Sequence, residues 1–326
     1  MMRKIGVLTS GGDAPGMNAA VMSIARSAAA YGMPLIGIKH GYNGLLRKST
    51  SIKDDLQELY LDTVLDIADQ PGTYLRTARC EEFKDPKWRE IAVQTLKAME
   101  IDGLVVIGGD GSFRGAADLS KAGIPCVGLP GTIDNDIQCS EYTIGYDTAM
   151  NTVMELVDKL RDTSHSHERC AVVEVMGRNA GHIALNTGVA CGATAILVPE
   201  IEFDIEDVIQ KIKNARANGK EQFIVIVAEG VGHTEEISKR INEETGIESR
   251  ATILGHVQRG GSPTVRDRVV ASEMGYYAVE LLEKGIGNRV VGMKNGKIYD
   301  VDIQEALSMK KPFDKRLYDI ANEISF

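Results

Sequence analysis

The segment LVVIGGDGSFRGA, residues 104–116, decides the fold class of this 326-residue chain. Its apolar run Leu104–Ile107 is too short for a helix and is rich in Val and Ile, which is typical of a buried strand. A glycine-rich turn follows, and the residues around Gly115 and Ala116 predict a helix. A strand, a turn and a helix in succession make up the repeating unit of parallel α/β sheets. We therefore expect an α/β protein.

The same unit recurs on both sides of this segment. Further predicted strands are Ile5–Leu8, Leu35–Ile38, Val127–Leu129, Val172–Val175, Ala195–Val198 and Phe223–Ala228. Amphipathic stretches separate them, most clearly at 148–160, which predicts a helix. A chain of this length favours two α/β lobes, with a boundary near residue 145. Ligands of such sheets bind beyond the carboxyl ends of the strands.

Two glycine-rich turns are candidate phosphate sites. GGDAPG (11–16) follows the first predicted strand and precedes an Ala-rich helix, and GGDGS (108–112) follows Leu104–Ile107. Such turns offer free backbone N–H groups and a positive helix end to a phosphate. Asp110 would then be the natural Mg²⁺ partner beside phosphate oxygens. The alternative is a pair of tight turns without a ligand, but two such loops favour a nucleotide.

A third loop, PGTIDND (130–136), carries two carboxylates directly after a predicted strand. Asp134 and Asp136 could take different roles, one accepting a proton from an attacking hydroxyl and the other staying near the metal and phosphates. The alternative is a surface Asx-turn.

Separated arginines suit bidentate phosphate recognition, although each alone could be a solvated surface charge. They are Arg169, Arg178, Arg250 and Arg259. Glu229 follows a predicted strand, where an acid could hold sugar hydroxyls or serve a helix cap. His165 and His167 lack partners at metal-binding spacing, and we interpret both as loop residues.

Composition excludes several classes of function. A net charge of -9 argues against a nucleic-acid or membrane-surface role, which needs a basic footprint. The first residues lack the apolar length of a signal peptide or membrane span. The five cysteines form no CxxC pair, so we expect buried thiols in a reducing, cytoplasmic setting.

Five motifs together resemble the bacterial ATP-dependent 6-phosphofructokinases: GVLTSGGDAPGMNAA (6–20), VVIGGDGSFRGA (105–116), GLPGTIDNDI (128–137), VEVMGR (173–178) and LGHVQRGGSPT (254–264). They occur in that family's order and span most of the chain. The resemblance implies a glycolytic, allosteric, Mg²⁺-dependent homotetramer that transfers the γ-phosphoryl of ATP to the 1-hydroxyl of fructose 6-phosphate. It also implies two similar three-layer α/β lobes with mainly parallel sheets and the active site in the cleft between them. The ATP-binding lobe would comprise 1–145 plus about 258–308, and the fructose 6-phosphate-binding lobe 146–257 plus about 309–326.

The resemblance assigns roles position by position. The ATP site would comprise Gly12, Tyr42, Arg79, Cys80, Gly109, Asp110, Gly111, Ser112 and Gly115, with Asp110 as magnesium ligand. The catalytic set would be Gly12, Thr132, Asp134, Asp136 and Arg178, with Asp134 the base. The sugar phosphate would meet Thr132, Ile133, Asp134, Arg169, Met176, Gly177, Arg178, Glu229, Arg250, His256, Val257, Gln258 and Arg259. Arg169 and Arg250 would reach its 6-phosphate from a neighbouring subunit.

Two glycines indicate the phosphoryl donor. Pyrophosphate-using relatives usually carry Asp at the position of Gly111 and Lys at that of Gly131. The two glycines leave room for ATP.

Departures from the family gather at its effector pocket, where ADP or phosphoenolpyruvate binds. Arg26, Arg161, Gly192 and Lys220 fit that pocket, whereas Met22, Thr194, Glu221 and Gln222 depart from it. Fewer cationic donors should weaken anion binding, so we expect a weak effector response. The segment 45–70 is longer than usual, and His182 and Pro71 are departures without a clear consequence.

Three alternatives remain open. A pyrophosphate-dependent phosphofructokinase is opposed by Gly111 and Gly131. A catalytically silent sensor of sugar phosphates or nucleotides would have no need of the base Asp134. A dinucleotide-dependent dehydrogenase would need a glycine spacing and a ribose-binding acid that are not evident.

Overall fold

We analysed a computed structural model that describes residues 4–46 and 55–325. Residues 47–54 of the predicted 45–70 extension therefore lie outside the described part. The chain divides into two compact units. Unit 1 comprises 1–133, 137–148 and 259–311, and unit 2 comprises 134–136, 149–258 and 312–326. Each unit draws on separate stretches of sequence.

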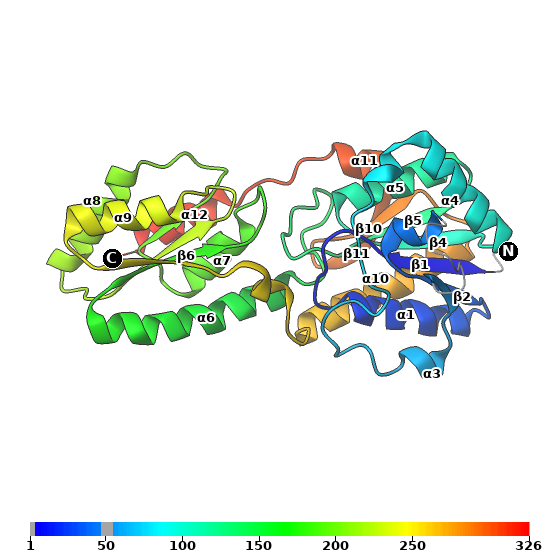
Figure 1. The fold of residues 1–326 in the computed structure, drawn as a ribbon, viewed down its shortest axis with the longest axis horizontal. Coiled ribbons are helices and arrows are strands. Elements are labelled where there is room, and N and C mark those ends of the chain that lie inside the picture. Colours follow the sequence, from blue (N-terminus) through cyan, green and yellow to red (C-terminus); the bar gives the residue numbers. More distant parts are fainter. Residues whose placement is uncertain (1–3, 47–54, 326) are drawn as a thin grey trace. The chain divides into compact units, whose positions relative to one another are not determined.

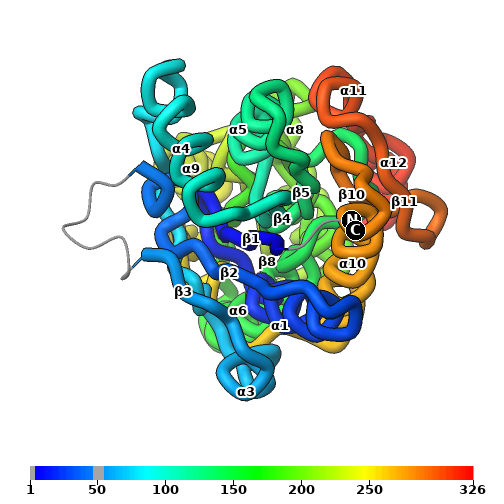
Figure 2. Tube along the Cα trace, turned by 90° about the vertical axis from the view of Figure 1, so that its right-hand side faces the viewer, coloured from blue at the N-terminus to red at the C-terminus, as the bar shows by residue number. Residues whose placement is uncertain are grey.

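The sheet of unit 1 is mainly parallel, with two antiparallel edge strands. Its order is β11-β10-β5-β4-β1-β2-β3, seen from β3 at the left to β11 at the right in Figure 2. The strands are β1 (Ile5–Thr9), β2 (Leu35–Ile38), β3 (Leu56–Glu58), β4 (Gly103–Gly108), β5 (Cys126–Pro130), β10 (Arg289–Lys294) and β11 (Lys297–Asp302). Only β3 and β11 run antiparallel to their neighbours.

Helices cover both faces of this sheet. Helices α1 (Met17–Ala30) and α10 (Val265–Glu283) lie side by side on one face, and α4 (Pro86–Ala98), α5 (Asp110–Lys121) and α11 (Ile303–Ser308) lie on the other (Figure 1). The remaining helical turns are η1 (Gly41–Leu45), α3 (Leu61–Val64) and η2 (Glu81–Lys84).

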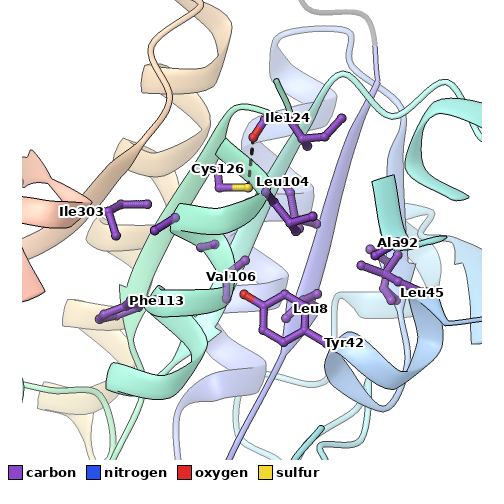
Figure 3. Packing of buried hydrophobic residues seen from close by; sticks show 14 of the residues in the cluster. Leu8, Tyr42, Leu45, Ala92, Leu104, Val106, Phe113, Ile124, Cys126 and Ile303 are labelled. Carbon is purple, nitrogen blue, oxygen red and sulfur yellow. Dashed lines mark hydrogen bonds between the residues drawn. The ribbon is translucent and has the colours of Figure 1, made fainter. Parts of the chain in front are cut away.

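The core beneath α4, α5 and α11 contains large apolar side chains from the sheet and from these helices (Figure 3). Phe113 of α5 packs directly on β5, because Gly128 has no side chain and a Cβ there would lie 2.7 Å from the Phe113 ring. Tyr42 is buried and stacks on Phe83 with ring centroids 4.2 Å apart. Trp88 packs at the edge of the same cluster.

The sheet of unit 2 is wholly parallel, in the order β7-β8-β6-β9. Its strands are β6 (Cys170–Val175), β7 (Ala195–Leu197), β8 (Phe223–Ala228) and β9 (Ser249–Ile253). Its helices are α6 (Tyr146–His167), α7 (His182–Ala190), α8 (Ile205–Ala217), α9 (Thr234–Thr245), α12 (Lys315–Glu323) and the short η3 (Gly255–Arg259). The first residues of α6 belong to unit 1. Phe223, Val225 and Val227 pack under α8 and α9. The intervening residues of β8 are also buried, so both faces of the sheet are covered.

The α/β class with mainly parallel sheets is confirmed, and all seven predicted strands are present within a residue or two. Strands β3, β9, β10 and β11 were not predicted. His165 and His167 are not loop residues, because α6 continues to His167. Asp110, Gly111 and Ser112 form the first turn of α5 rather than a loop.

The cysteines follow the expectation of buried thiols in four cases. Cys126, Cys139, Cys170 and Cys191 are buried, whereas Cys80 is half-buried. Burial raises the pKa of the Cys126 thiol to about 12, which keeps it protonated at neutral pH. Within the described residues, no helix is long and apolar enough to cross a membrane.

Candidate active site

Three predicted loops meet at one edge of the unit 1 sheet. Strands β1, β4 and β5 are neighbours and parallel, with Thr9 opposite Ile107 and Gly108 opposite Pro130. Their carboxyl ends therefore coincide, and the segments that follow them lie together. Ser10 donates its N–H to the Ile107 carbonyl (2.9 Å), and Gly131 donates to the Gly108 carbonyl (3.0 Å). These backbone bonds join the Gly11, Gly109 and Gly131 loops into one surface.

The turn into α5 packs against the first glycine loop. The Ser112 hydroxyl donates to the Ser10 carbonyl (3.2 Å). A Cβ on Gly108 would lie 2.5 Å from that same carbonyl, so a glycine is needed for this close approach. The first backbone N–H groups of α5 are consequently directed to the carboxyl edge of the sheet, where a helix N-terminus favours an anion.

Tyr42, Arg79 and Cys80 join the same surface through two further segments. The Tyr42 hydroxyl donates to the Ser112 carbonyl (2.6 Å). The Thr77 hydroxyl donates to the Gly11 carbonyl (2.9 Å), and Asn43 donates to the Arg79 carbonyl (3.2 Å). Tyr42 and the stretch that contains Arg79 are thus tied to the same edge of unit 1 as the first glycine loop and the start of α5, and Cys80 follows Arg79 directly and packs against the apolar core.

Asp110 begins α5 with its carboxylate partly exposed and ion-paired to Arg114, Nε to Oδ2 2.9 Å. The described residues contain no group of three or more His, Cys, Asp or Glu placed to hold a metal ion. A single carboxylate at the N-terminus of α5 fits Mg²⁺, which keeps several waters and binds through one or two carboxylates plus phosphate oxygens.

The PGTIDND segment is largely buried and is held by an isolated β-bridge to Ile144. Thr132, Ile133 and Asp134 are all buried. Thr132 donates its N–H to the Ile144 carbonyl (3.1 Å), and Ile144 donates to the Pro130 carbonyl (2.8 Å). Asn135 has a positive φ of 51°, which turns the chain sharply between the two carboxylates of Asp134 and Asp136.

Arg259 lies against the first glycine loop. Its Nη1 donates to the Asp13 carbonyl (2.8 Å). A Cβ on Gly12 would lie 2.6 Å from the same nitrogen, so Gly12 leaves space for the guanidinium. The predicted sugar-phosphate ligand Arg259 is therefore already placed beside the predicted catalytic residue Gly12.

A second convergence occurs in unit 2. Strands β8, β6 and β9 are parallel neighbours, and the predicted residues follow their carboxyl ends. Met176 donates its N–H to the Gln258 side chain (3.1 Å), and the N–H of Arg178 is bonded to the Glu229 carboxylate. His256 and Val257 are exposed on η3 nearby in sequence. Gly177 has a φ of 141° and a Cβ there would lie 2.3 Å from the Ala180 carbonyl, so only glycine fits this turn.

Arg169 and Arg250 lie at the opposite end of the same sheet. Arg169 precedes β6, and Arg250 pairs with Ala171 near the start of β9. Both pair with Glu248, at 2.8 Å in each case. The six residues of β6, at about 3.3 Å each, separate Arg169 from the carboxyl edge by roughly 20 Å. Arg250 is level with Ala171, four residues or roughly 13 Å before Val175. Within this chain the two arginines therefore do not join Arg178 and Glu229.

Six of the eight predicted effector residues lie in unit 2. Arg161 donates to the Cys191 carbonyl beside Gly192. Burial, and to a lesser extent the nearby Arg161, lower the pKa of Lys220. Thr194 is fully buried, Glu221 is exposed and Gln222 is half-buried. Met22 and Arg26 lie on α1 of unit 1.

A buried carboxylate near the catalytic segment was missed from the sequence. Asp267 of α10 is fully buried and accepts a hydrogen bond from Tyr142 (2.6 Å). Its only signal in the sequence is a place three residues after Thr264, the N-cap of α10. Its partner Tyr142 is 125 residues away in the sequence, so local sequence patterns cannot predict the contact.

Gly115→Ala is expected to destabilise the protein by about 1–3 kcal/mol, because the new methyl would overpack the core. The Cβ would lie 2.7 Å from the ring of buried Tyr42. Urea unfolding would measure the loss. The matched control is Gly111→Ala in the same helix, where a Cβ meets nothing within 4 Å. It should gain up to about 1 kcal/mol from helix propensity. Equal stability of the two variants would contradict the proposed contact.

Comparison with known proteins gives a consistent result. The model of the family described as "Phosphofructokinase" matches residues 4–282. A curated Clostridium botulinum (strain Hall) protein named ATP-dependent 6-phosphofructokinase is 57% identical over 99% of this chain and 100% of its own length. One from Clostridium perfringens, named ATP-dependent 6-phosphofructokinase 1, is 54% identical over the same shares of the two chains.

Solved structures show the same fold. Phosphofructokinase from Saccharomyces cerevisiae has a TM-score of 0.88 and 32% identity, covering 99% of this chain and 48% of that one. A pyrophosphate-dependent phosphofructokinase from Marinobacter aquaeolei has a TM-score of 0.86 over 97% of this chain and 86% of its own, at 20% identity. The second likeness concerns the fold alone.

Proposed function

This chain belongs to the phosphofructokinase family, and we propose how its own residues carry out the ATP-dependent phosphorylation of fructose 6-phosphate. The observation that carries the proposal is the meeting of the Gly11, Gly109 and Gly131 loops at one edge of the unit 1 sheet. We assign ATP to unit 1 and fructose 6-phosphate chiefly to unit 2. The cytoplasmic location expected from the sequence stays a prediction.

The ATP phosphates would lie along the glycine loops at the N-terminus of α5. The backbone N–H groups there bind anions without a side chain in the way. Asp110 and the phosphate oxygens would hold Mg²⁺, which neutralises charge that develops on the transferring phosphoryl group. Arg114, now paired with Asp110, would release that carboxylate to the metal.

Transfer of the phosphoryl group needs alignment and charge stabilisation more than covalent help. We assign Asp134 as the base that removes the proton from the sugar 1-hydroxyl. Arg178 would stabilise the transferring group, and Thr132 and Asp136 would align it. The positive φ of Arg178 (58°) supports its role, since backbone strain of this kind gathers at functional sites.

The sugar phosphate would be held by Met176, Gly177, Glu229 and the η3 residues. Arg169 and Arg250 are too far along the strands to reach the same ligand. We therefore propose that they serve the 6-phosphate site of a neighbouring subunit. This arrangement requires at least two subunits, because each site would need residues from two chains, and the homotetramer expected from the sequence would supply them.

The direct test is product formation by the purified protein with Mg²⁺ and fructose 6-phosphate, offered ATP and pyrophosphate in parallel. Fructose 1,6-bisphosphate would be detected through aldolase. We expect rapid turnover with ATP alone. Turnover with pyrophosphate alone would overturn the assignment of the donor, and no turnover with either would favour a silent sensor.

The effector response is expected to be weak. Arg161 and Lys220 supply cations, but Thr194 is buried and Glu221 adds an exposed carboxylate. Millimolar phosphoenolpyruvate or ADP should therefore leave the half-saturating fructose 6-phosphate concentration nearly unchanged. The matched variant Glu221→Lys should raise the sensitivity. A several-fold shift in the unmodified protein would contradict this prediction.

A further inference from the structure

Asp267 is the centre of a buried hydrogen-bond cluster. Its Oδ1 accepts from the Tyr142 hydroxyl (2.6 Å) and the Gly145 N–H (2.7 Å). Its Oδ2 accepts from the N–H (2.9 Å) and the hydroxyl (2.5 Å) of Thr148. Four donors thus point at one carboxylate, all within unit 1, and they belong to three residues of the segment 142–148, called the strap below.

Burial of the Asp267 carboxylate in this cluster lowers the stability of the fold. Burial raises the pKa of Asp267, while the four hydrogen bonds oppose that rise because they favour the charged form. No hydrogen bond to a cationic side chain is among them, and Arg266 lies instead over the Tyr142 ring, 4.6 Å from its centroid. A well-packed apolar residue often stabilises a core as well as a buried charge does. A role in placing the strap explains the carboxylate better than stability does.

The strap in turn holds the catalytic segment. Thr143 donates its hydroxyl to the Thr132 carbonyl (2.6 Å). Ile144 exchanges backbone hydrogen bonds with Pro130 and Thr132, forming an isolated parallel bridge between Gly131 and Ile144. Thr143 and Ile144 lie between Tyr142 and Gly145, the two residues bonded to Oδ1. Displacement of the strap would therefore displace Thr132.

We propose that Asp267 is a positioning residue for phosphoryl transfer, which fixes the backbone of Thr132 through the strap and so aligns the segment that carries Asp134. The inference rests on the proposed function of that segment. Asp267 touches neither substrate in this scheme. Its effect should therefore appear in kcat rather than in KM.

Asp267→Asn is the first test. The variant keeps the size of the side chain but turns one acceptor into an amide NH₂ group, which faces two donors whichever way it is flipped. We expect kcat to fall by about 10–100-fold with both KM values within about twofold, since small misplacements of reacting groups carry penalties of this order. An unchanged kcat in a folded variant would overturn the proposal.

The matched control is Asp300→Asn. Asp300 also belongs to unit 1, accepts from Tyr277 (2.7 Å) and pairs with Arg289, but it does not contact the strap. We expect a comparable loss of stability on urea unfolding without the loss of kcat. If both variants lose kcat equally, Asp267 acts only through general stability and the proposal fails.

A second variant tests the contact between the strap and Thr132. Thr143→Val removes only the hydroxyl that bonds to Thr132, so it remains informative if Asp267→Asn does not fold. It should lower kcat in the same direction. The double variant should be no worse than Asp267→Asn alone, because both changes break one chain of contacts. Multiplicative effects would show independent roles and overturn the proposal.

Hydrogen exchange provides a readout that does not depend on activity. Asp267→Asn should speed exchange of the Thr132 and Ile144 amides, which are bonded to the Ile144 and Pro130 carbonyls, and Asp300→Asn should not. Unchanged exchange at both amides would refute the proposal that Asp267 fixes Thr132 through the strap. If the unmodified protein shows no turnover, the proposed function fails, yet this comparison still decides whether Asp267 fixes Thr132.

Discussion

Replacing Asp134 by Ser is expected to lower kcat by about 10²–10⁴-fold, which is the usual contribution of a positioned general base. KM for ATP and for fructose 6-phosphate should change little, because Asp134 contributes to the transition state more than to the bound ground state. The side chain is buried within the PGTIDND segment, and Ser is smaller, so the fold should accept the change. The aldolase-coupled assay would measure both constants.

Asp134→Asn is the matched variant, because it keeps the shape of the side chain and removes only the basicity. Both variants should lose turnover to a similar degree. Retention of near-normal kcat by either one would remove Asp134 from the role of base. Loss of ATP binding, measured by titration without the sugar, would instead indicate a collapsed site.

Gly111→Asp is expected to raise the KM for ATP by about 10²-fold, which corresponds to about 2.7 kcal/mol. Gly111 is exposed in the first turn of α5, and a Cβ there meets nothing within 4 Å. An acidic residue in that turn favours the helix dipole, so stability should hold. The new carboxylate would, however, lie beside Asp110 and repel the nucleotide phosphates. Steady-state kinetics with ATP varied would measure the change.

Gly111→Ala separates charge from size, and it should raise the KM for ATP far less than Gly111→Asp does. Equal losses in the two variants would contradict the electrostatic explanation. Gly111→Asp should not gain turnover with pyrophosphate. The second position that distinguishes the donors is Gly131, where a Cβ would lie 2.9 Å from both Ile107 and Met17, so a Lys there requires the core to shift.

Local patterns predicted the buried strands well because strands covered on both faces are nearly continuous apolar runs. Strand β9 escaped detection because Ser249, Arg250 and Thr252 interrupt its apolar residues, and it pairs on one side only. Strands β10 and β11 form an antiparallel hairpin, which departs from the strand–turn–helix unit that the other strands follow.

The glycine loops of the site could be placed together from sequence because parallel neighbouring strands end at one edge. Two other features of the site could not be predicted from the sequence. The separation of Arg169 and Arg250 from Arg178 depends on strand register, with Arg250 opposite Ala171. The Asp267 cluster joins residues more than a hundred positions apart, and nothing local in the sequence indicates such partners.

The split composition of unit 1 has a consequence for synthesis on the ribosome. The N-terminus of the nascent chain emerges first. However, β5 pairs with β10 and α1 packs against α10, and both β10 and α10 come later in the sequence than all of unit 2 except its last segment. Until those residues emerge, the β5 edge and one side of α1 stay uncovered, a state prone to association with other chains. The stretch 149–258 contains all four strands of its own sheet and can fold earlier. The central part of the polypeptide should therefore reach its native form before the part that begins it.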